Sequence, residues 1–166
     1  MTETAAKFAF AGHAFLRPEP AHLAALAREL GDPAFVEAIE QSPGALEPAY
    51  NHLFLNPGGT PCPPWQSAHA GEGRLMGEPH LRVLEWFRRY GIEPRAMNDP
   101  ADHIGLLLLF YAELLRLGVE EVDLEVFRRE HLAWIPAFCE CVAREGRHPF
   151  YRLLAEQTSL LVREAC

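Results

Sequence analysis

The chain has 166 residues, near the usual size of one domain, and 49% of them are hydrophobic, which is enough material for a buried core. Its formal charge of −8 argues against nucleic acid as a partner, because an acidic surface repels phosphate backbones. The longest apolar run, Ile104 to Ala112, falls short of the roughly 20 residues needed to span a bilayer. No basic, leader-like stretch is found at the N-terminus. We expect one domain spanning residues 1–166, cytoplasmic and not stably inserted in a membrane.

Proline and glycine divide the first part of the chain into helical segments. Leucines at helical spacing follow Pro20 and stop at Gly31. Asp32-Pro33 then has the residue types of a helix N-cap and first turn, and Ser42-Pro43 repeats the pattern. These positions predict three successive helices.

The second part continues in the same way. Pro79 begins a helix that ends at Gly91, and Asp99-Pro100 begins the longest and most apolar helix, which stops near Gly118. Further helices are expected at Val122 to Leu132, at Ile135 to Arg144 and from His148-Pro149 onward. Because alternating strand patterns are absent, the sequence predicts an all-α, single-domain bundle packed around a central apolar helix near Ile104 to Leu117.

A Pro-rich loop at residues 56–66 interrupts the helical pattern. It reads N-P-G-G-T-P-C-P-P and then reaches Trp65. Each proline restricts the residue before it to extended conformations, so this is a stiff connector. It presents a large amphipathic ring at its end.

The four cysteines do not have the spacing of a metal site. Cys139 and Cys141 are two residues apart, which places them about 200° apart around a helix. No CxxC or HxxxH pattern supplies further ligands. We expect reduced, structural thiols, no metal and no cofactor.

The segment from Asn98 to His103 has two interpretations. In the first, Asp99 caps a helix, Pro100 occupies its first position, and Asp102 returns a hydrogen bond to the cap. In the second, Asp102 and His103 lie at an exposed helix mouth and offer a carboxylate and an imidazole to a ligand.

An Asp-His pair also suggests a small hydrolase that uses Asp102 or His103. Adjacent helical residues diverge by about 100°, however, so these two cannot orient each other. No nucleophile elbow, phosphate loop or zinc-protease motif accompanies them, and no base is identifiable beside Cys62. We therefore expect no enzymatic activity and keep hydrolysis as an alternative.

Aromatic residues have a similar ambiguity. Tyr50, Leu53 and Phe54 lie at helical spacing, which is typical of core positions. A tryptophan that follows a proline run, as Trp65 does, is also the kind of residue that anchors a peptide in a groove.

Several motifs in this order resemble the TorD/DmsD family of molybdoenzyme maturation chaperones. They are Tyr50-x-x-Leu53-Phe54, Pro63-Pro64-Trp65-x-Ser67, Leu75-Met76-Gly77-Glu78, Asn98-Asp99-Pro100-x-Asp102-His103-x-Gly105, His131-Leu132 with Trp134 and Phe138-Cys139, and His148-Pro149-Phe150-Tyr151. The resemblance covers about Tyr50 to Leu161. Two positions depart from the family pattern: Asp99 stands where glutamate is usual, and His131-Leu132-Ala133-Trp134 lacks a proline.

The resemblance implies an all-helical, non-catalytic protein. It implies binding of the twin-arginine leader, and of the apoprotein, of a molybdopterin oxidoreductase catalytic subunit until cofactor insertion is complete, before export. The peptide-binding positions that it implies are Tyr50, Leu53, Phe54, Pro64, Trp65, Asp102 and His103. Family members occur as monomers and as domain-swapped dimers, so the oligomeric state stays open. The alternatives are a nitrate-reductase-type assembly chaperone for a non-exported subunit, a small hydrolase and a structural dimerisation module.

Overall fold

The computed structural model describes residues 1–71, 73–93 and 99–166. Within these ranges it holds helices and no β-strand. The α-helices are α1 (Glu3–Leu16), α2 (Pro20–Leu30), α3 (Pro33–Glu40), α4 (Leu46–Phe54), α5 (Gln66–His69), α6 (Glu78–Arg89), α7 (Ile104–Arg116), α8 (Glu121–Phe127), α9 (Ile135–Glu145) and α10 (Pro149–Ala165). A 3₁₀ turn, Pro43–Ala45, precedes α4, and a π-helical turn, Arg128–Leu132, follows α8. The predicted all-α fold is confirmed.

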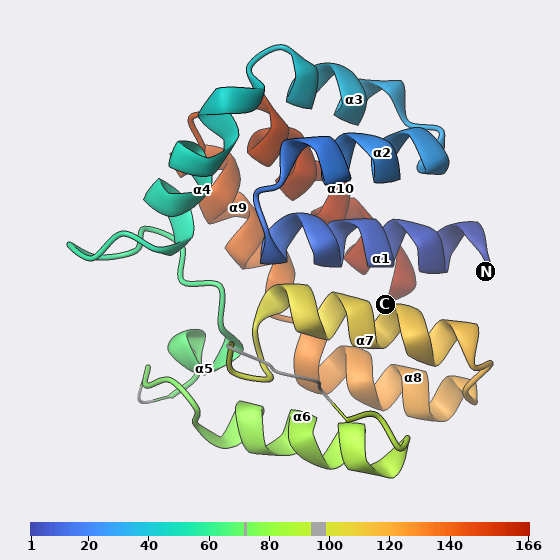
Figure 1. Cartoon of the computed structure of the whole chain (residues 1–166). Helices are drawn as coiled ribbons and strands as arrows, with labels where there is room; N and C mark the ends of the chain where they lie inside the picture. The colour runs from blue at the N-terminus through green and yellow to red at the C-terminus, as the bar shows by residue number, and fades with distance from the viewer. Residues whose placement is uncertain (72, 94–98) are drawn as a thin grey trace.

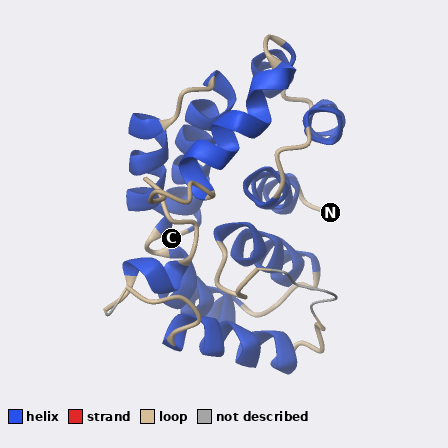
Figure 2. Cartoon of the chain, turned by 60° about the vertical axis from the view of Figure 1, so that its left-hand side comes forward, coloured by secondary structure: helices blue, strands red, loops and turns tan. Residues whose placement is uncertain are grey.

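α1 and α7 lie side by side in the middle of the bundle (Figure 1). α2 and α3 pack on one side of this pair, and α6 and α8 lie on the other. α9 and α10 pack against each other behind them. Figure 2 shows the same bundle from another side, with loops linking the helices.

The central helix is α7, as predicted. Eight of its thirteen residues are buried, so it meets neighbours on most sides. It crosses α1 where two glycines face each other: a Cβ atom on Gly12 would lie 2.8 Å from the carbonyl oxygen of Gly105, and one on Gly105 would lie 2.7 Å from that of Gly12. The absence of both side chains lets the two backbones approach closely.

The start of α7 differs from the prediction. The helix begins at Ile104, and its N-cap is His103 rather than Asp99. Residues 100–103 form a turn in which the amide of His103 donates to the carbonyl of Pro100 (3.0 Å). The prediction that this helix is the longest is also wrong, because α10 has 17 residues and α7 has 13. Asn98 lies outside the described residues.

Most other helix boundaries agree with the proline and glycine pattern. Gly31 ends α2 in the left-handed conformation (φ 75°), and the Asp32 carboxylate caps α3. His148 caps α10 through its ring nitrogen. Ser42 differs, since its side chain makes no capping hydrogen bond and a 3₁₀ turn follows it. α1 was not predicted, although Thr2 is an N-cap of the usual type: its hydroxyl accepts from the amide of Ala5 (3.2 Å), and Glu3 follows in the first turn.

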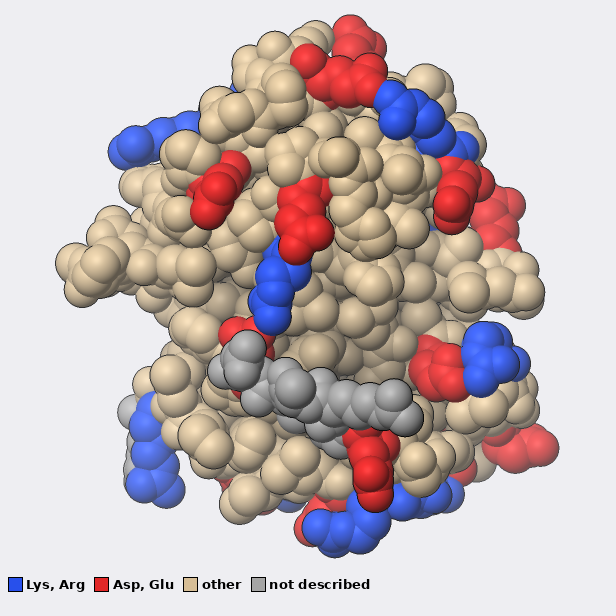
Figure 3. Space-filling view, in the orientation of Figure 1, with Lys and Arg blue, Asp and Glu red and all other residues tan. Residues whose placement is uncertain are grey.

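Charged side chains of both signs are spread over the surface. On the face in Figure 3, acidic and basic groups lie next to each other at several places, with broad uncharged areas between them. No helix in the described part of the chain is long and apolar enough to cross a membrane.

Candidate functional site

The end of the Pro-rich loop pairs with the start of α7. The amide of Ile104 donates to the carbonyl of Pro64 (2.8 Å), and the amide of Gln66 donates to the carbonyl of Asp102 (3.1 Å). Between these bonds, Trp65 and His103 form an isolated antiparallel bridge. The structure therefore brings Pro64, Trp65, Asp102 and His103 together.

The carboxylate of Asp102 binds Ser67, in the segment that follows Trp65. One carboxylate oxygen, Oδ2, accepts from the backbone amide of Ser67 (2.7 Å) and from its hydroxyl (2.5 Å). The hydroxyl oxygen of Ser67 in turn accepts from the amide of Gly77 (3.2 Å). Asp102 is 0% exposed, so the expectation of an exposed helix mouth is wrong: the carboxylate faces its own chain.

His103 has a capping role. Its Nδ1 accepts from the amide of Gly105 (3.0 Å), and the residue is 2% exposed. Burial lowers the pKa of His103, which keeps the ring neutral and Nδ1 free to accept. Asp99, the predicted cap, instead pairs with Arg17 (3.3 Å).

Trp65 is half-buried, whereas Pro64 is buried. The indole ring meets the His103 ring edge to face, with centroids 6.0 Å apart. Its Nε1 is buried and has no acceptor among the described residues. Unpaired buried donors are uncommon in folded proteins, so this atom requires an explanation.

The other three predicted positions lie on α4 and belong to the core. Tyr50, Leu53 and Phe54 are all buried. The Tyr50 hydroxyl donates to the carbonyl of Phe15 (2.9 Å), and the Phe54 ring stacks on Phe138. Their burial agrees with the core interpretation of their spacing.

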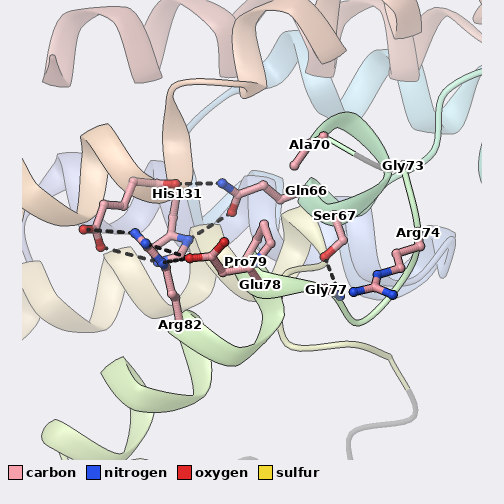
Figure 4. A pocket seen from close by; sticks show the side chains of 12 residues that line it. Gln66, Ser67, Ala70, Gly73, Arg74, Gly77, Glu78, Pro79, Arg82 and His131 are labelled. Carbon is pink, nitrogen blue, oxygen red and sulfur yellow. Dashed lines mark hydrogen bonds and ion pairs between the residues drawn. The ribbon is translucent and has the colours of Figure 1, made fainter.

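A cavity of about 520 Å³ adjoins the Ser67 end of this junction (Figure 4). It lies between α5, the loop before α6, the first turn of α6 and the π-helical turn. The residues that line it are Gln66, Ser67, Ala70, Gly71, Gly73, Arg74, Gly77, Glu78, Pro79, Arg82, Glu130 and His131.

Gln66 connects α5 to the π-helical turn. Its side-chain amide donates to the carbonyl of Glu130 (2.7 Å), and its oxygen accepts from Nδ1 of His131 (2.9 Å). Burial lowers the pKa of His131 to about 4, so the ring is neutral near pH 7. With the proton on Nδ1, Nε2 is an acceptor; it is buried, makes no hydrogen bond and lies 3.9 Å from the Glu130 carboxylate.

Charged residues form one wall of the cavity. Arg82 donates to Oε1 of Glu78 from Nε (3.1 Å) and from Nη2 (2.8 Å), and its Nη1 lies 3.7 Å from Oε1 of Glu130. The indole of Trp86 donates to the other Glu130 oxygen (3.3 Å).

Sequence reasoning did not assign these cavity residues to a site. Glu78 and His131 occur in the family motifs without a role, and Gln66, Arg82 and Glu130 stood in no motif. Glu78 and Arg82 are four apart on one helix, which could have suggested a pair. The approach of Glu130 and His131 depends on tertiary packing and has no local sequence pattern.

A disulfide fixes the Pro-rich loop to α9. Cys62 and Cys141 are bonded, with Cα atoms 6.0 Å apart, so the expectation of free thiols is wrong for these two. Cys139 and Cys166 are free. Among the residues that the structure describes, no group of three or more His, Cys, Asp or Glu side chains could hold a metal ion.

Comparisons with known proteins agree with the sequence motifs. Residues 18–140 match the family model described as nitrate reductase delta subunit. The chain is 32% identical over 118 residues to the Tat proofreading chaperone DmsD of Salmonella typhi, covering 70% of this chain and 58% of that protein. It is 28% identical over 137 residues to the chaperone protein TorD of Vibrio vulnificus, covering 71% and 64%. It therefore spans less than two thirds of the length of either relative.

A solved structure has the same fold. The crystal structure of a candidate redox enzyme maturation protein from Archaeoglobus fulgidus superposes with a TM-score of 0.75 at 25% sequence identity, over 98% of this chain and 94% of that one. The helical architecture, the family match over residues 18–140 and these relatives lead to one assignment. The chain belongs to the TorD/DmsD family.

Proposed function

We propose that this chain is a cytoplasmic redox enzyme maturation chaperone. It binds the twin-arginine leader of a molybdopterin oxidoreductase subunit and holds the apoprotein until its cofactor is inserted. The names of its relatives, a Tat proofreading chaperone and a TorD chaperone, support a role of this kind.

The observation that carries the proposal is a cluster of unpaired polar atoms. Five buried side-chain polar atoms in the described residues lack a partner, and three of them belong to this region: Trp65 Nε1, Asp102 Oδ1 and His131 Nε2. One is a donor and two are acceptors. An extended peptide offers both a carbonyl and an amide at each residue, and an arginine offers further donors. A bound peptide would therefore offer partners to His131 Nε2, which belongs to a residue lining the cavity, and to Trp65 Nε1, next to the lining residue Gln66, whereas Asp102 Oδ1 stays inside the fold. Both atoms are buried in the free chain, so the peptide reaches them by displacing the side chains that cover them.

The surface next to the cavity suits the apolar part of a leader. Leu75 and Met76 are 50% and 61% exposed and lie in the loop that supplies Arg74 and Gly77 to the cavity. Leu81 is 58% exposed on α6, beside Arg82. Exposed apolar side chains in the segments that form a cavity offer surface to an apolar ligand.

The predicted peptide-binding residues have different roles in this proposal. Trp65, the half-buried member of the set, contacts the leader. Pro64, Asp102 and His103 hold Trp65 and Ser67 in place, so Asp102 acts through Ser67 and not by a bidentate contact with a guanidinium. Tyr50, Leu53 and Phe54 support the site from the core.

Calorimetric titration tests the proposal. A panel of synthetic twin-arginine leaders from molybdopterin oxidoreductases is titrated into the chain, with shuffled peptides of equal composition as controls. We expect saturable binding of at least one leader and none of its shuffled form. No saturable binding across the panel contradicts the proposal.

The description of the family model favours a second candidate, an assembly chaperone for a subunit that is not exported. In that case the bound N-terminal segment need not contain twin arginines. Equal binding of a leader and of its Lys-Lys variant would favour this candidate. The hydrolase alternative gains no support, because Nδ1 of His103 is engaged by the amide of Gly105.

A further inference from the structure

The guanidinium of Arg82 lies between two carboxylates at the cavity wall. It donates twice to Glu78 (2.8 and 3.1 Å), and Nη1 is 3.7 Å from Glu130. The side chains of Arg82 and Glu78 are 51% and 74% exposed, whereas that of Glu130 is 29% exposed. Ion pairs this exposed are screened by water and contribute little, so Arg82 is held weakly.

Glu130 keeps its orientation without Arg82. Its Oε2 accepts from the indole of Trp86 (3.3 Å), and its backbone carbonyl accepts from the side chain of Gln66 (2.7 Å). The carboxylate is therefore a preorganised acceptor at the cavity, and a ligand that uses it loses little conformational freedom in the protein.

His131 adds an acceptor that no described residue satisfies. The residue is 0% exposed, lines the cavity, and its Nε2 makes no hydrogen bond. This atom lies 3.9 Å from Oε2 of Glu130. A positively charged donor with several N–H groups would complement both this neutral imidazole nitrogen and the carboxylate oxygen beside it.

An arginine side chain has these properties. Its guanidinium is a rigid fork of five N–H donors that can contact two acceptors at once, whereas a lysine is a single charged point. A guanidinium inside the cavity would also be less screened by solvent than Arg82 is on the rim.

When a ligand displaces Arg82 from Glu78 and Glu130, a second acidic partner is available to it. Glu85 is three residues along α6, and both residues line a second cavity that shares Glu78 and Glu130 with the first. Residues three apart on a helix face the same side, so Arg82 can turn toward Glu85.

We propose that Glu78, Glu130 and His131 bind an arginine side chain of the leader, and that Arg82 occupies this place in the free chain until the leader displaces it. The inference rests on the proposed function and names the residues that distinguish arginine from lysine. Arg82 is then an internal competitor, so removing it and removing its acceptors have opposite effects on affinity.

Three variants test these opposite effects. Glu130→Gln keeps the shape of the side chain and an acceptor for Trp86 but removes the charge. We expect it to weaken binding of a twin-arginine leader by about tenfold or more, because a hydrogen bond to a charged group is lost. Arg82→Gln removes the competitor, and we expect it to strengthen binding by about two- to fivefold. Glu78→Gln is a second acceptor variant that does not touch the Trp86 contact.

A matched pair elsewhere controls for net charge. Arg116 and Glu113 on α7 form an ion pair with side chains 50% and 35% exposed, close to the values for Arg82 and Glu130. Arg116→Gln changes the net charge by the same amount as Arg82→Gln, and Glu113→Gln by the same amount as Glu130→Gln. Each variant is titrated with the twin-arginine leader and with its Lys-Lys form, and thermal unfolding verifies its fold.

The outcomes separate this inference from the function on which it rests. We expect Glu130→Gln to reduce the ratio of Arg-Arg to Lys-Lys affinity and the control variants to leave it unchanged. If the wild-type chain binds leaders but the variants of Glu78, Glu130 and Arg82 have the same ratio of Arg-Arg to Lys-Lys affinity as the wild type, the inference alone is overturned. A wild-type chain that binds no leader overturns both.

Discussion

Histidine rings in this protein bind backbone amides. Nδ1 of His80 accepts from Ala101 (2.8 Å), and those of His103 and His148 accept from residues two positions later in the chain. The acceptor nitrogen must be unprotonated, because a protonated ring has donors only. His103 and His148 thus fill N-cap positions where serine or aspartate is usual.

Two buried histidines, His103 and His131, predict that acid destabilises the fold. Burial lowers the pKa of His103, and it lowers that of His131 from 6.5 to about 4. In the unfolded chain both titrate normally, so the unfolded state binds protons first as the pH falls. Their stabilisation is complete above pH 6.5 and is lost toward pH 4, by up to about 1.4 kcal/mol per pH unit for each ring.

Urea unfolding at about pH 7 and about pH 5.5 measures this loss. His131→Gln should reduce the difference in free energy of unfolding between the two values, since one titrating ring is gone. Equal stability of the wild-type chain at both pH values contradicts the assignment.

Trp65 gives a prediction for binding. If its indole contacts the leader, Trp65→Ala should weaken leader binding by about 2 kcal/mol or more, as expected for a central aromatic anchor. Calorimetry measures the affinity, and circular dichroism verifies the fold. An unchanged affinity with an intact fold would leave Trp65 with a packing role only.

At the residue scale, the family resemblance grouped seven positions, of which the structure brings four together and places three, Tyr50, Leu53 and Phe54, in the core. The grouping of Pro64, Trp65, Asp102 and His103 followed from the family resemblance, and the structure places these four together. Their burial depends on partners distant in sequence, such as Ser67 for Asp102. A single sequence does not encode such pairings locally.

At the scale of elements, the crossing of α1 and α7 depends on two glycines. A Cβ atom on Gly12 would lie 2.6 Å from Leu109 Cγ and 2.8 Å from the Gly105 carbonyl oxygen. We expect Gly12→Ala to lower the free energy of unfolding by about 1–3 kcal/mol, because the backbones must separate. Gly44→Ala, where an added Cβ meets no atom within 4 Å, is the control. Denaturant unfolding compares them, and equal stability of the two variants would contradict a tight crossing.

The disulfide gives a second prediction for the elements. Cys62 and Cys141 are 79 residues apart, so their bond restricts a long loop of the unfolded chain. Reduction should lower the free energy of unfolding by about 2–4 kcal/mol. The double variant Cys62→Ser, Cys141→Ser should not respond to the reductant. If the reductant does not change the free energy of unfolding of the wild-type chain either, the disulfide is absent in solution.

Several helix boundaries followed from a local cap or breaker. Gly31, Asp32 and His148 act as their residue types suggest. The start of α7 was not predictable, because the turn at 100–103 is held by the ring of His80 on another helix. The π-helical turn after α8 likewise has no local pattern, and it is the element that brings Glu130 and His131 to the cavity.

At the scale of the whole molecule, the sequence indicated the fold class, the central apolar helix and the family. Apolar periodicity and ordered motifs carry this information, since they reflect the packing of the entire chain. The cavity was not predictable, because its walls come from α5, α6 and the turn after α8. The net charge of −8 was a weak guide to it, because acidic groups are spread among basic ones over the surface.

The most direct test locates the leader on the chain. A twin-arginine leader carrying a photo-crosslinking residue beside its arginines is irradiated with the wild-type chain, and the linked residues are identified by mass spectrometry. We expect crosslinks to the cavity walls, at residues 66–71, 73–82 and 130–131, that excess unlabelled leader abolishes. Crosslinks that are competed away but fall on α2, α3 or α10 would contradict the proposed site.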